Sequence, residues 1–146
     1  MQTLSKAWGL AGLRLGMGFA SPQIISLLNK IKPPYNINLL SQQTALEQLE
    51  FLDQKNSQVD TILQQRDWLS HELKQLKKVH EVYPTDANFV LVKMDNATDI
   101  YNKMVEKSII LRNRSTVKLC FDCIRITIGT PEENKELLRN LAELLN

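Results

Sequence analysis

Apolar residues recur at helical spacing over a long stretch in the middle of the chain, from about residue 41 to residue 78. Leucine, isoleucine and valine side chains there fall mostly three or four positions apart, and no proline or glycine interrupts them. We therefore expect one long helix, or two helices with a bend near Asn56 and Ser57. At 1.5 Å per residue the stretch would be about 57 Å long. In a small chain, a helix of that length typically bridges two domains or packs in an interface.

From residue 79 to the end of the chain, short apolar runs alternate with helical patterns. The stretches that we expect to be strands are 79–83, 88–92, 109–111 and 123–128. Helical spacing predicts a helix over 96–106, and Thr130 followed by Pro131 predicts the cap of a last helix. Strands interleaved with helices predict the α/β fold class and a small lobe over 79–146.

The first twenty residues hold four of the five glycines of the chain. Such clustering marks close approach of the backbone, so residues 3–20 predict a strand, a tight turn and a second strand with apolar side chains covered on both faces. Ser21 and Pro22 then begin a short helix with a buried apolar stripe, and Pro33 ends it. We expect a division into three parts, 1–38, 39–78 and 79–146.

The composition limits the classes of function. With 43% apolar and 23% charged residues, the chain can bury the core of a single domain. The net charge of +2 is too small to indicate a nucleic-acid partner. No apolar run approaches the roughly 20 residues of a membrane-spanning helix. The low cysteine count and the absence of a signal peptide favour the cytoplasm.

The two cysteines, Cys120 and Cys123, form a Cys-x-x-Cys pair. This spacing is typical of a redox site or of half a metal site. A zinc site needs two more ligands, and the two histidines of the chain lie apart from each other and from the pair. We therefore expect no metal site and interpret the pair as two thiols beside a buried strand.

Residues that carry chemistry gather near the N-terminus, where Ser5 and Lys6 precede Arg14 among small residues. A primary amine can condense with an aldehyde, whereas a hydroxyl and a guanidinium can hold a phosphate. These are the groups that pyridoxal phosphate (PLP) requires. Arg14 stands between Leu13 and Leu15, and a charge buried in an apolar run needs a partner, which argues against a surface salt bridge.

The order of these residues resembles the lysine segment of fold-type I aminotransferases, Ser-Lys-x-x-x-Leu-Ala-Gly-x-Arg-x-Gly. The whole chain resembles the C-terminal part of the histidinol-phosphate aminotransferases, a family of class II aminotransferases with that fold type. The matching segments are 3–16, 32–36, 88–89, 109–112 and 124–130. The resemblance implies the end of a large domain, a long connecting helix and a small α/β domain. The chain would therefore be a fragment that lacks most of the cofactor-binding domain.

The resemblance also implies a role for each matching residue. Lys6 would form the Schiff base with PLP and then move a proton during the reaction. Ser5 and Arg14 would hold the phosphate of the cofactor. Arg125 would bind the anionic end of the substrate, and the alternation of its strand places it on the face opposite the neighbouring isoleucines.

Two further residues match substrate-binding positions of the family. Arg112 matches a second substrate-binding arginine, although Arg114 competes for the same role and a strand-end surface charge is equally consistent with the pattern. Tyr35 would line the active site or the seam of a dimer, or it would only hold the linker in place by packing.

The implied activity is the transfer of an amino group between L-histidinol phosphate and 2-oxoglutarate in histidine biosynthesis, by a homodimer. A threonine-phosphate decarboxylase or another class I or II aminotransferase is the alternative among PLP enzymes. A non-enzymatic α/β interaction module built on residues 41–78 is the alternative outside them. We expect the fragment alone to be inactive and to self-associate through its uncovered apolar strands.

Overall fold

The computed structural model describes residues 1–145, and the chain divides into two units, Met1–Val59 and Asp60–Asn146. The division falls within the longest helix, α3 (Leu52–Leu73), so the C-terminal turns of α3 belong to the second unit. Within residues 1–145, no helix is both long and apolar enough to cross a membrane.

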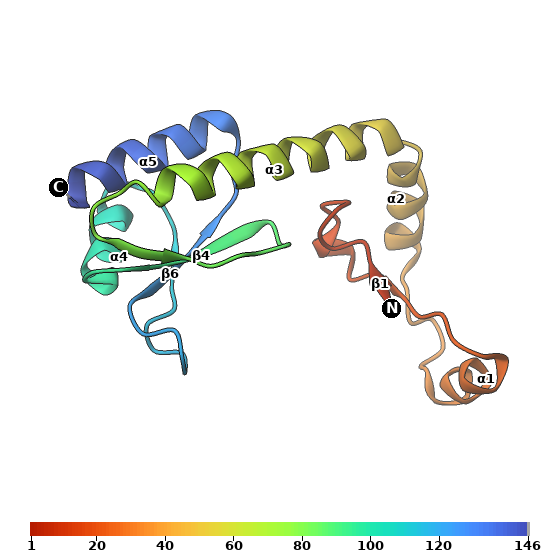
Figure 1. Cartoon of the computed structure of the whole chain (residues 1–146). Helices are drawn as coiled ribbons and strands as arrows, with labels where there is room; N and C mark the ends of the chain where they lie inside the picture. Colours follow the sequence, from red (N-terminus) through yellow and green to blue (C-terminus); the bar gives the residue numbers. More distant parts are fainter. Residues whose placement is uncertain (146) are drawn as a thin grey trace. The chain divides into compact units, whose positions relative to one another are not determined.

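The second unit is built on a four-stranded antiparallel sheet with the strand order β3-β4-β6-β5 (Figure 1). The strands are β3 (Val79–Val82), β4 (Phe89–Met94), β5 (Arg112–Asn113) and β6 (Cys123–Thr127). The helix α4 (Ala97–Glu106) follows β4, and α5 (Pro131–Leu145) ends the described chain. The expected strands at 79–83, 88–92 and 123–128 and both expected helices are confirmed, with shifts of a few residues at their ends.

The core lies on one face of this sheet, under α4, α5 and the C-terminal turns of α3 (Figure 1). Every second residue of β4 and β6 points into it, because side chains alternate between the two faces of a strand. The cross-strand partners Val90 and Ile126 are both fully buried, as are Val92 and Ile124. The helices contribute the buried side chains of Leu69, Leu73, Ile100, Met104, Leu137 and Leu141.

A capping box begins α5, as the sequence predicts. The backbone N–H of Thr130 donates to Glu133 Oε2 at 2.7 Å, and the backbone N–H of Glu133 donates to Thr130 Oγ1 at 3.3 Å. This pair satisfies N–H groups that have no partner within the first turn of a helix. The start of α1 (Pro22–Ile31) differs, because the side chain of Ser21 makes no cap hydrogen bond.

This difference gives a matched pair of variants for stability. Thr130→Ala should lower the free energy of unfolding by about 1 kcal/mol, because it removes an N-cap hydrogen bond. Ser21→Ala should have a much smaller effect, although both residues precede a proline at the start of a helix. Urea denaturation followed by circular dichroism measures both changes. Equal losses would show that the cap hydrogen bond of Thr130 adds no stability beyond that of the unbonded Ser21 side chain.

The first unit is less regular than the sequence pattern predicts. Between β1 (Gln2–Thr3) and β2 (Gly16–Met17), which pair antiparallel, lies a short 3-10 helix, η1 (Ala11–Leu13). The expected strand, turn and strand are therefore present, but each strand is only two residues long. The apolar residues of this segment are not covered on both faces as expected, because no further strand of the described chain pairs with β1 or β2.

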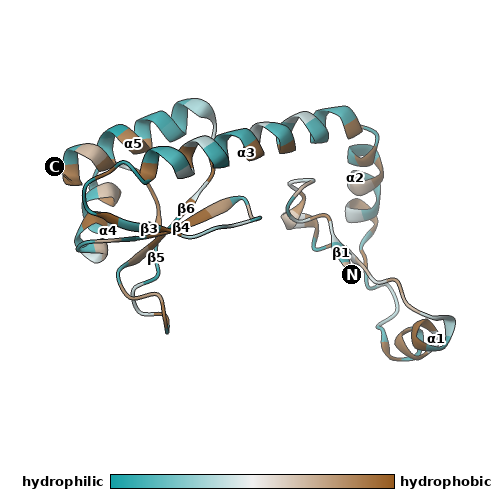
Figure 2. Cartoon of the chain, in the orientation of Figure 1, coloured by the Kyte–Doolittle hydropathy of each residue, from teal (hydrophilic) through white to brown (hydrophobic). Residues whose placement is uncertain are grey.

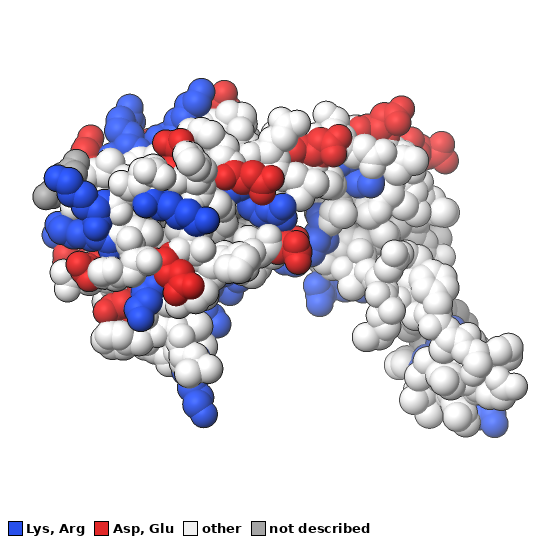
Figure 3. Space-filling view, viewed as in Figure 1, with Lys and Arg blue, Asp and Glu red and all other residues white. Residues whose placement is uncertain are grey.

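The expected burial of the first helix is wrong. No residue of α1 is buried, and most of its apolar side chains are exposed, for example Leu27 at 62% and Ile31 at 78%. In Figure 2 much of this helix is brown, the colour of hydrophobic residues, and in Figure 3 mainly uncharged atoms cover it. The sequence marks an apolar stripe correctly, but this unit leaves most of the stripe uncovered.

Two predicted boundaries are also corrected. The stretch 41–78 forms two helices, but α2 (Leu39–Leu49) ends well before Asn56 and Ser57, which lie inside α3. The N–H groups of Glu50 and Phe51 bond three residues back, and this tightened turn separates the helices. The expected strand 109–111 is not a strand, and β5 begins at Arg112 instead. The N–H of Ile109 bonds the carbonyl of Met104, and Ser108 has a left-handed φ of 62°, so the start of this segment forms the C-terminal cap of α4.

Candidate functional site

An arginine pair stands on the face of the sheet that the helices leave open. Arg125 of β6 lies opposite Arg112 of β5 in the strand register, and its partner on the other side is Leu91 of β4. Residues directly opposite in neighbouring strands point to the same face. Because Ile124 and Ile126 point into the core, the two arginines share the other face. The structure therefore brings together two of the residues that the sequence predicts to bind substrate.

The guanidinium of Arg125 is held in place by an aromatic ring. It lies 4.8 Å from the centre of the Phe89 ring, which is near enough for a cation–π interaction. Its Nε atom is buried and has no hydrogen-bond partner among the described residues. An unpaired buried donor costs free energy, so this N–H is suited to an acceptor that a ligand supplies.

Positive charge is concentrated around this donor. Burial lowers the pKa of Arg125, and the charges of Arg112 and Arg114 lower it further. The backbone N–H of Arg114 donates to the carbonyl of Cys123 at 2.8 Å, which ties it to β6. We call Arg112, Arg114 and Arg125 the arginine cluster. The three positive charges repel one another, and a bound anion relieves this repulsion. Each guanidinium can donate two parallel hydrogen bonds to the oxygens of a carboxylate or a phosphate.

The contribution of Phe89 was missed by reasoning from the sequence. The signal was present, because Phe89 alternates with Val90 and therefore belongs to the open face, as does Arg125. The alternation within one strand does not give the register of β4 against β6. In that register Phe89 lies opposite Thr127, two residues beyond Arg125.

The lysine segment of the first unit is a loop closed by backbone hydrogen bonds. The N–H of Gly9 bonds the carbonyl of Lys6 at 2.9 Å, and the N–H of Leu10 bonds that of Leu4 at 3.0 Å. Gly9 has a φ of 66°, which a glycine adopts without strain. The side chain of Lys6 is exposed and makes no hydrogen bond or ion pair with a described residue. Its amine is therefore accessible.

Arg14 lies in the same unit, but its expected burial is wrong. The residue is exposed, has a left-handed φ of 56°, and its Nη1 donates to the carbonyl of Ala11 at 3.1 Å. Ser5 is half-buried, and its backbone N–H donates to Thr3 Oγ1 at 3.2 Å. Neither Ser5 nor Arg14 is paired with a described carboxylate. An amine, a hydroxyl and a guanidinium thus remain available to a ligand, and these groups fit an aldehyde that carries a phosphate.

Tyr35 lies in the turn after α1. It is 97% exposed and has a left-handed φ of 57°. No described residue bonds its hydroxyl, so its expected place in a site or a dimer seam stays a prediction.

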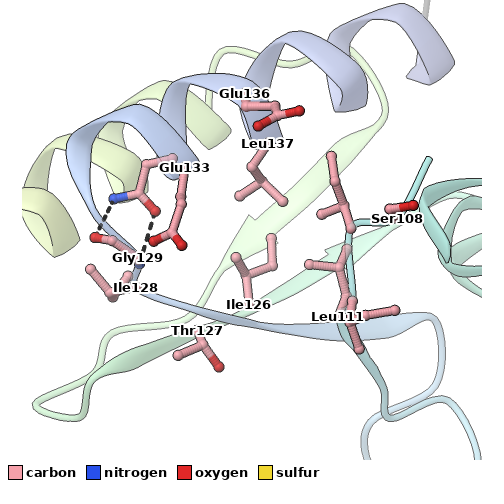
Figure 4. Close-up of a pocket in the computed structure, with 12 residues that line it drawn as sticks. Ser108, Leu111, Ile126, Thr127, Ile128, Gly129, Glu133, Glu136 and Leu137 are labelled. Atoms are coloured by element: carbon pink, nitrogen blue, oxygen red, sulfur yellow. Dashed lines mark hydrogen bonds between the residues drawn. The ribbon is translucent and has the colours of Figure 1, made fainter.

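A pocket of about 490 Å³ lies between the end of β6, the first turns of α5 and the segment 108–111 (Figure 4). The amide of Asn134 spans one side of it, accepting from the N–H of Gly129 and donating to its carbonyl, both at 3.0 Å. Ile126, Leu137 and Glu136 line it, and no residue of the arginine cluster does. Because its ionisable side chains are carboxylates, an anionic ligand fits the arginine cluster better than this pocket.

The family model of aminotransferase class I and II matches residues 1–141. The histidinol-phosphate aminotransferase of Cytophaga hutchinsonii is 54% identical over 138 residues, which cover 94% of this chain and 40% of that protein. The chain therefore spans well under half the length of this relative.

Solved structures show the same fold. The histidinol-phosphate aminotransferase from Clostridium acetobutylicum has a TM-score of 0.88 at 23% identity, covering 99% of this chain and 44% of that one. The enzyme of the same name from Sinorhizobium meliloti, crystallised with pyridoxal-5′-phosphate, has a TM-score of 0.83 at 24% identity and covers 98% of this chain and 39% of that one. The expected α/β fold of a fold-type I transferase is confirmed. The chain belongs to the family of class I and II aminotransferases.

Proposed function

We propose that this chain is the C-terminal part of a PLP-dependent aminotransferase that moves an amino group between L-histidinol phosphate and 2-oxoglutarate in histidine biosynthesis. The observation that carries the proposal is the buried, unpartnered Nε of Arg125 within the arginine cluster. The 54% identity to a histidinol-phosphate aminotransferase supports the choice of substrate.

The arginine cluster suits both half-reactions. L-Histidinol phosphate has a phosphate and no carboxylate, whereas glutamate and 2-oxoglutarate present carboxylates. A guanidinium fork binds either anion through two parallel N–H groups. Arg125 would be the principal contact, because its guanidinium already rests against the Phe89 ring and its buried Nε has no other partner among the described residues. Arg112, its cross-strand partner, would add a second contact from β5.

The lysine segment would serve the cofactor. PLP supplies an aldehyde that holds the amino group and a ring that withdraws electrons from the bond to be broken. The accessible amine of Lys6 would bind that aldehyde and carry the proton to and from the substrate α-carbon. Ser5 and Arg14 would hold the cofactor phosphate. A rotation of the Arg14 side chain away from its own turn would free the Nη1 that now bonds Ala11.

The most direct experiment is a chimera. The part of the Cytophaga hutchinsonii relative that precedes its match to this chain is joined to residues 1–146 in place of its own C-terminal part. We expect the purified chimera to be yellow with bound PLP and to form glutamate from 2-oxoglutarate when L-histidinol phosphate is added. The unaltered relative is the control for yield and rate.

Other outcomes of this experiment separate the alternatives. A folded but colourless chimera would contradict the proposal and favour the non-enzymatic module. Release of carbon dioxide from threonine phosphate, without amino transfer, would identify a decarboxylase. Circular dichroism establishes beforehand that the chimera is folded.

The complete enzyme would act as a cytoplasmic homodimer, and the apolar surface of α1 is our candidate for a buried interface. In α1, Ile24, Leu27 and Ile31 are each more than half exposed, and Phe19, shortly before the helix, is 74% exposed. A contiguous apolar surface of this kind marks an interaction site. The isolated chain should therefore sediment as dimers or larger species at rising concentration. Leu27→Lys together with Ile31→Lys should shift it towards the monomer, and a wild-type chain that stays monomeric would refute the candidate.

A further inference from the structure

The Cys-x-x-Cys pair lies in a tight turn that leads into β6. The N–H of Cys123 donates to the carbonyl of Cys120 at 3.1 Å, which is the hydrogen bond that closes a four-residue β-turn. Asp122, the third residue of the turn, has a φ of 54°, a conformation that aspartate tolerates. The Cα atoms at the ends of such a turn lie within about 7 Å of each other, which is the range that a disulfide can span.

The two thiols differ in solvent exposure. Both are free, with Cys120 half-buried and Cys123 only 1% exposed. The Sγ of Cys123 lies 3.5 Å from the carbonyl oxygen of Phe121, inside the turn. Burial raises the pKa of Cys123, and the charge of the nearby Cys120 raises it further. The accessible thiol can therefore react first and the sheltered one second.

We propose that Cys120 and Cys123 are a reversible oxidation site that closes to an intramolecular disulfide when a hydroperoxide attacks. The thiolate of Cys120 displaces the leaving group from the peroxide oxygen, giving a sulfenic acid and an alcohol or water. The thiol of Cys123 then attacks that sulfur, so the S–S bond forms, the S–O bond breaks and water leaves. Two thiols are oxidised and one peroxide is reduced, and a dithiol reverses the bond.

The position of this site gives the bond a structural consequence. Cys123 lies two residues before Arg125 on the same face of β6, and its carbonyl accepts from the N–H of Arg114. The disulfide would therefore brace the loop that joins two members of the arginine cluster. The thiol chemistry itself does not depend on the proposed amino transfer and can be tested on the 146-residue chain alone.

The experiment treats the native chain with hydrogen peroxide, then unfolds it in urea and blocks the remaining thiols with iodoacetamide, so that a buried thiol is labelled too. The peptides are analysed by mass spectrometry. We expect the peptide with both cysteines to lose two hydrogen atoms, to escape alkylation and to regain two alkylation sites after dithiothreitol. Phe121→Ala, a change at an exposed residue of the same turn, should leave this result unaltered. Cys120→Ser and Cys123→Ser should each abolish it.

Three results would overturn the proposal. They are full alkylation of both cysteines after peroxide treatment, a sulfinic acid on Cys120 without a disulfide, and disulfides only between two chains. Circular dichroism of each variant shows whether it is folded, and the wild-type chain gives the decisive reading without any substitution.

Discussion

Lys6→Ala in the chimera should abolish amino transfer, with a fall in kcat on the order of 10⁴-fold or more, because the variant loses the group that moves the proton. The variant should also lose the covalent link to the cofactor aldehyde. Borohydride reduction followed by peptide mapping measures this directly. In the unaltered chimera, the reduced cofactor should be found on the peptide that contains Lys6.

The control for this prediction is Lys135→Ala, which removes an exposed lysine of α5. It should leave both the rate and the labelled peptide unchanged. Reduced cofactor attached to any lysine other than Lys6 would refute the catalytic assignment, whatever the rate of the variant.

Arg125→Ala should reduce kcat/KM for L-histidinol phosphate by about 30- to 1,000-fold, equivalent to about 2–4 kcal/mol. The variant removes a half-buried guanidinium that contacts the Phe89 ring and whose buried Nε has no partner in the described chain. The loss should extend to glutamate, because the same fork would bind its carboxylate. Steady-state kinetics with each substrate measures both effects.

Arg125→Lys separates geometry from charge. An ammonium keeps the positive charge but lacks the planar fork, so we expect it to recover only a small part of the lost activity. Arg139→Ala, at an exposed position of α5, should have no effect on kcat/KM. Equal losses in the Arg125 and Arg139 variants would show that Arg125 contributes only general positive charge.

The second unit could be predicted well from the sequence, since its elements follow from local rules. The alternation of Ile124, Arg125 and Ile126 fixes which side chain avoids the core, and the pattern from Thr130 to Glu133 fixes the start of α5. The first unit was predicted less well. Periodicity marks the apolar stripe of α1, but it does not say what covers that stripe, and its side chains are exposed.

The errors in the boundaries have a common cause. No glycine or proline marks the end of α2, which depends on two hydrogen bonds at Glu50 and Phe51. The segment 109–111 is rich in β-branched residues, which predicts a strand. Its residues instead follow α4 directly and line a pocket. For the candidate site, local patterns identify Arg125, whereas its contact with Phe89 depends on a cross-strand register that they do not contain.

The strict alternation of β6 has a consequence for how this region can vary in length. A deletion or insertion of one residue within β6 would exchange the two faces for the residues on one side of the change, and directly before Arg125 it would turn the guanidinium of Arg125 towards the apolar core. Relatives with the same chemistry should therefore differ in length in the loop before the strand, residues 115–122, and keep the strand itself free of gaps.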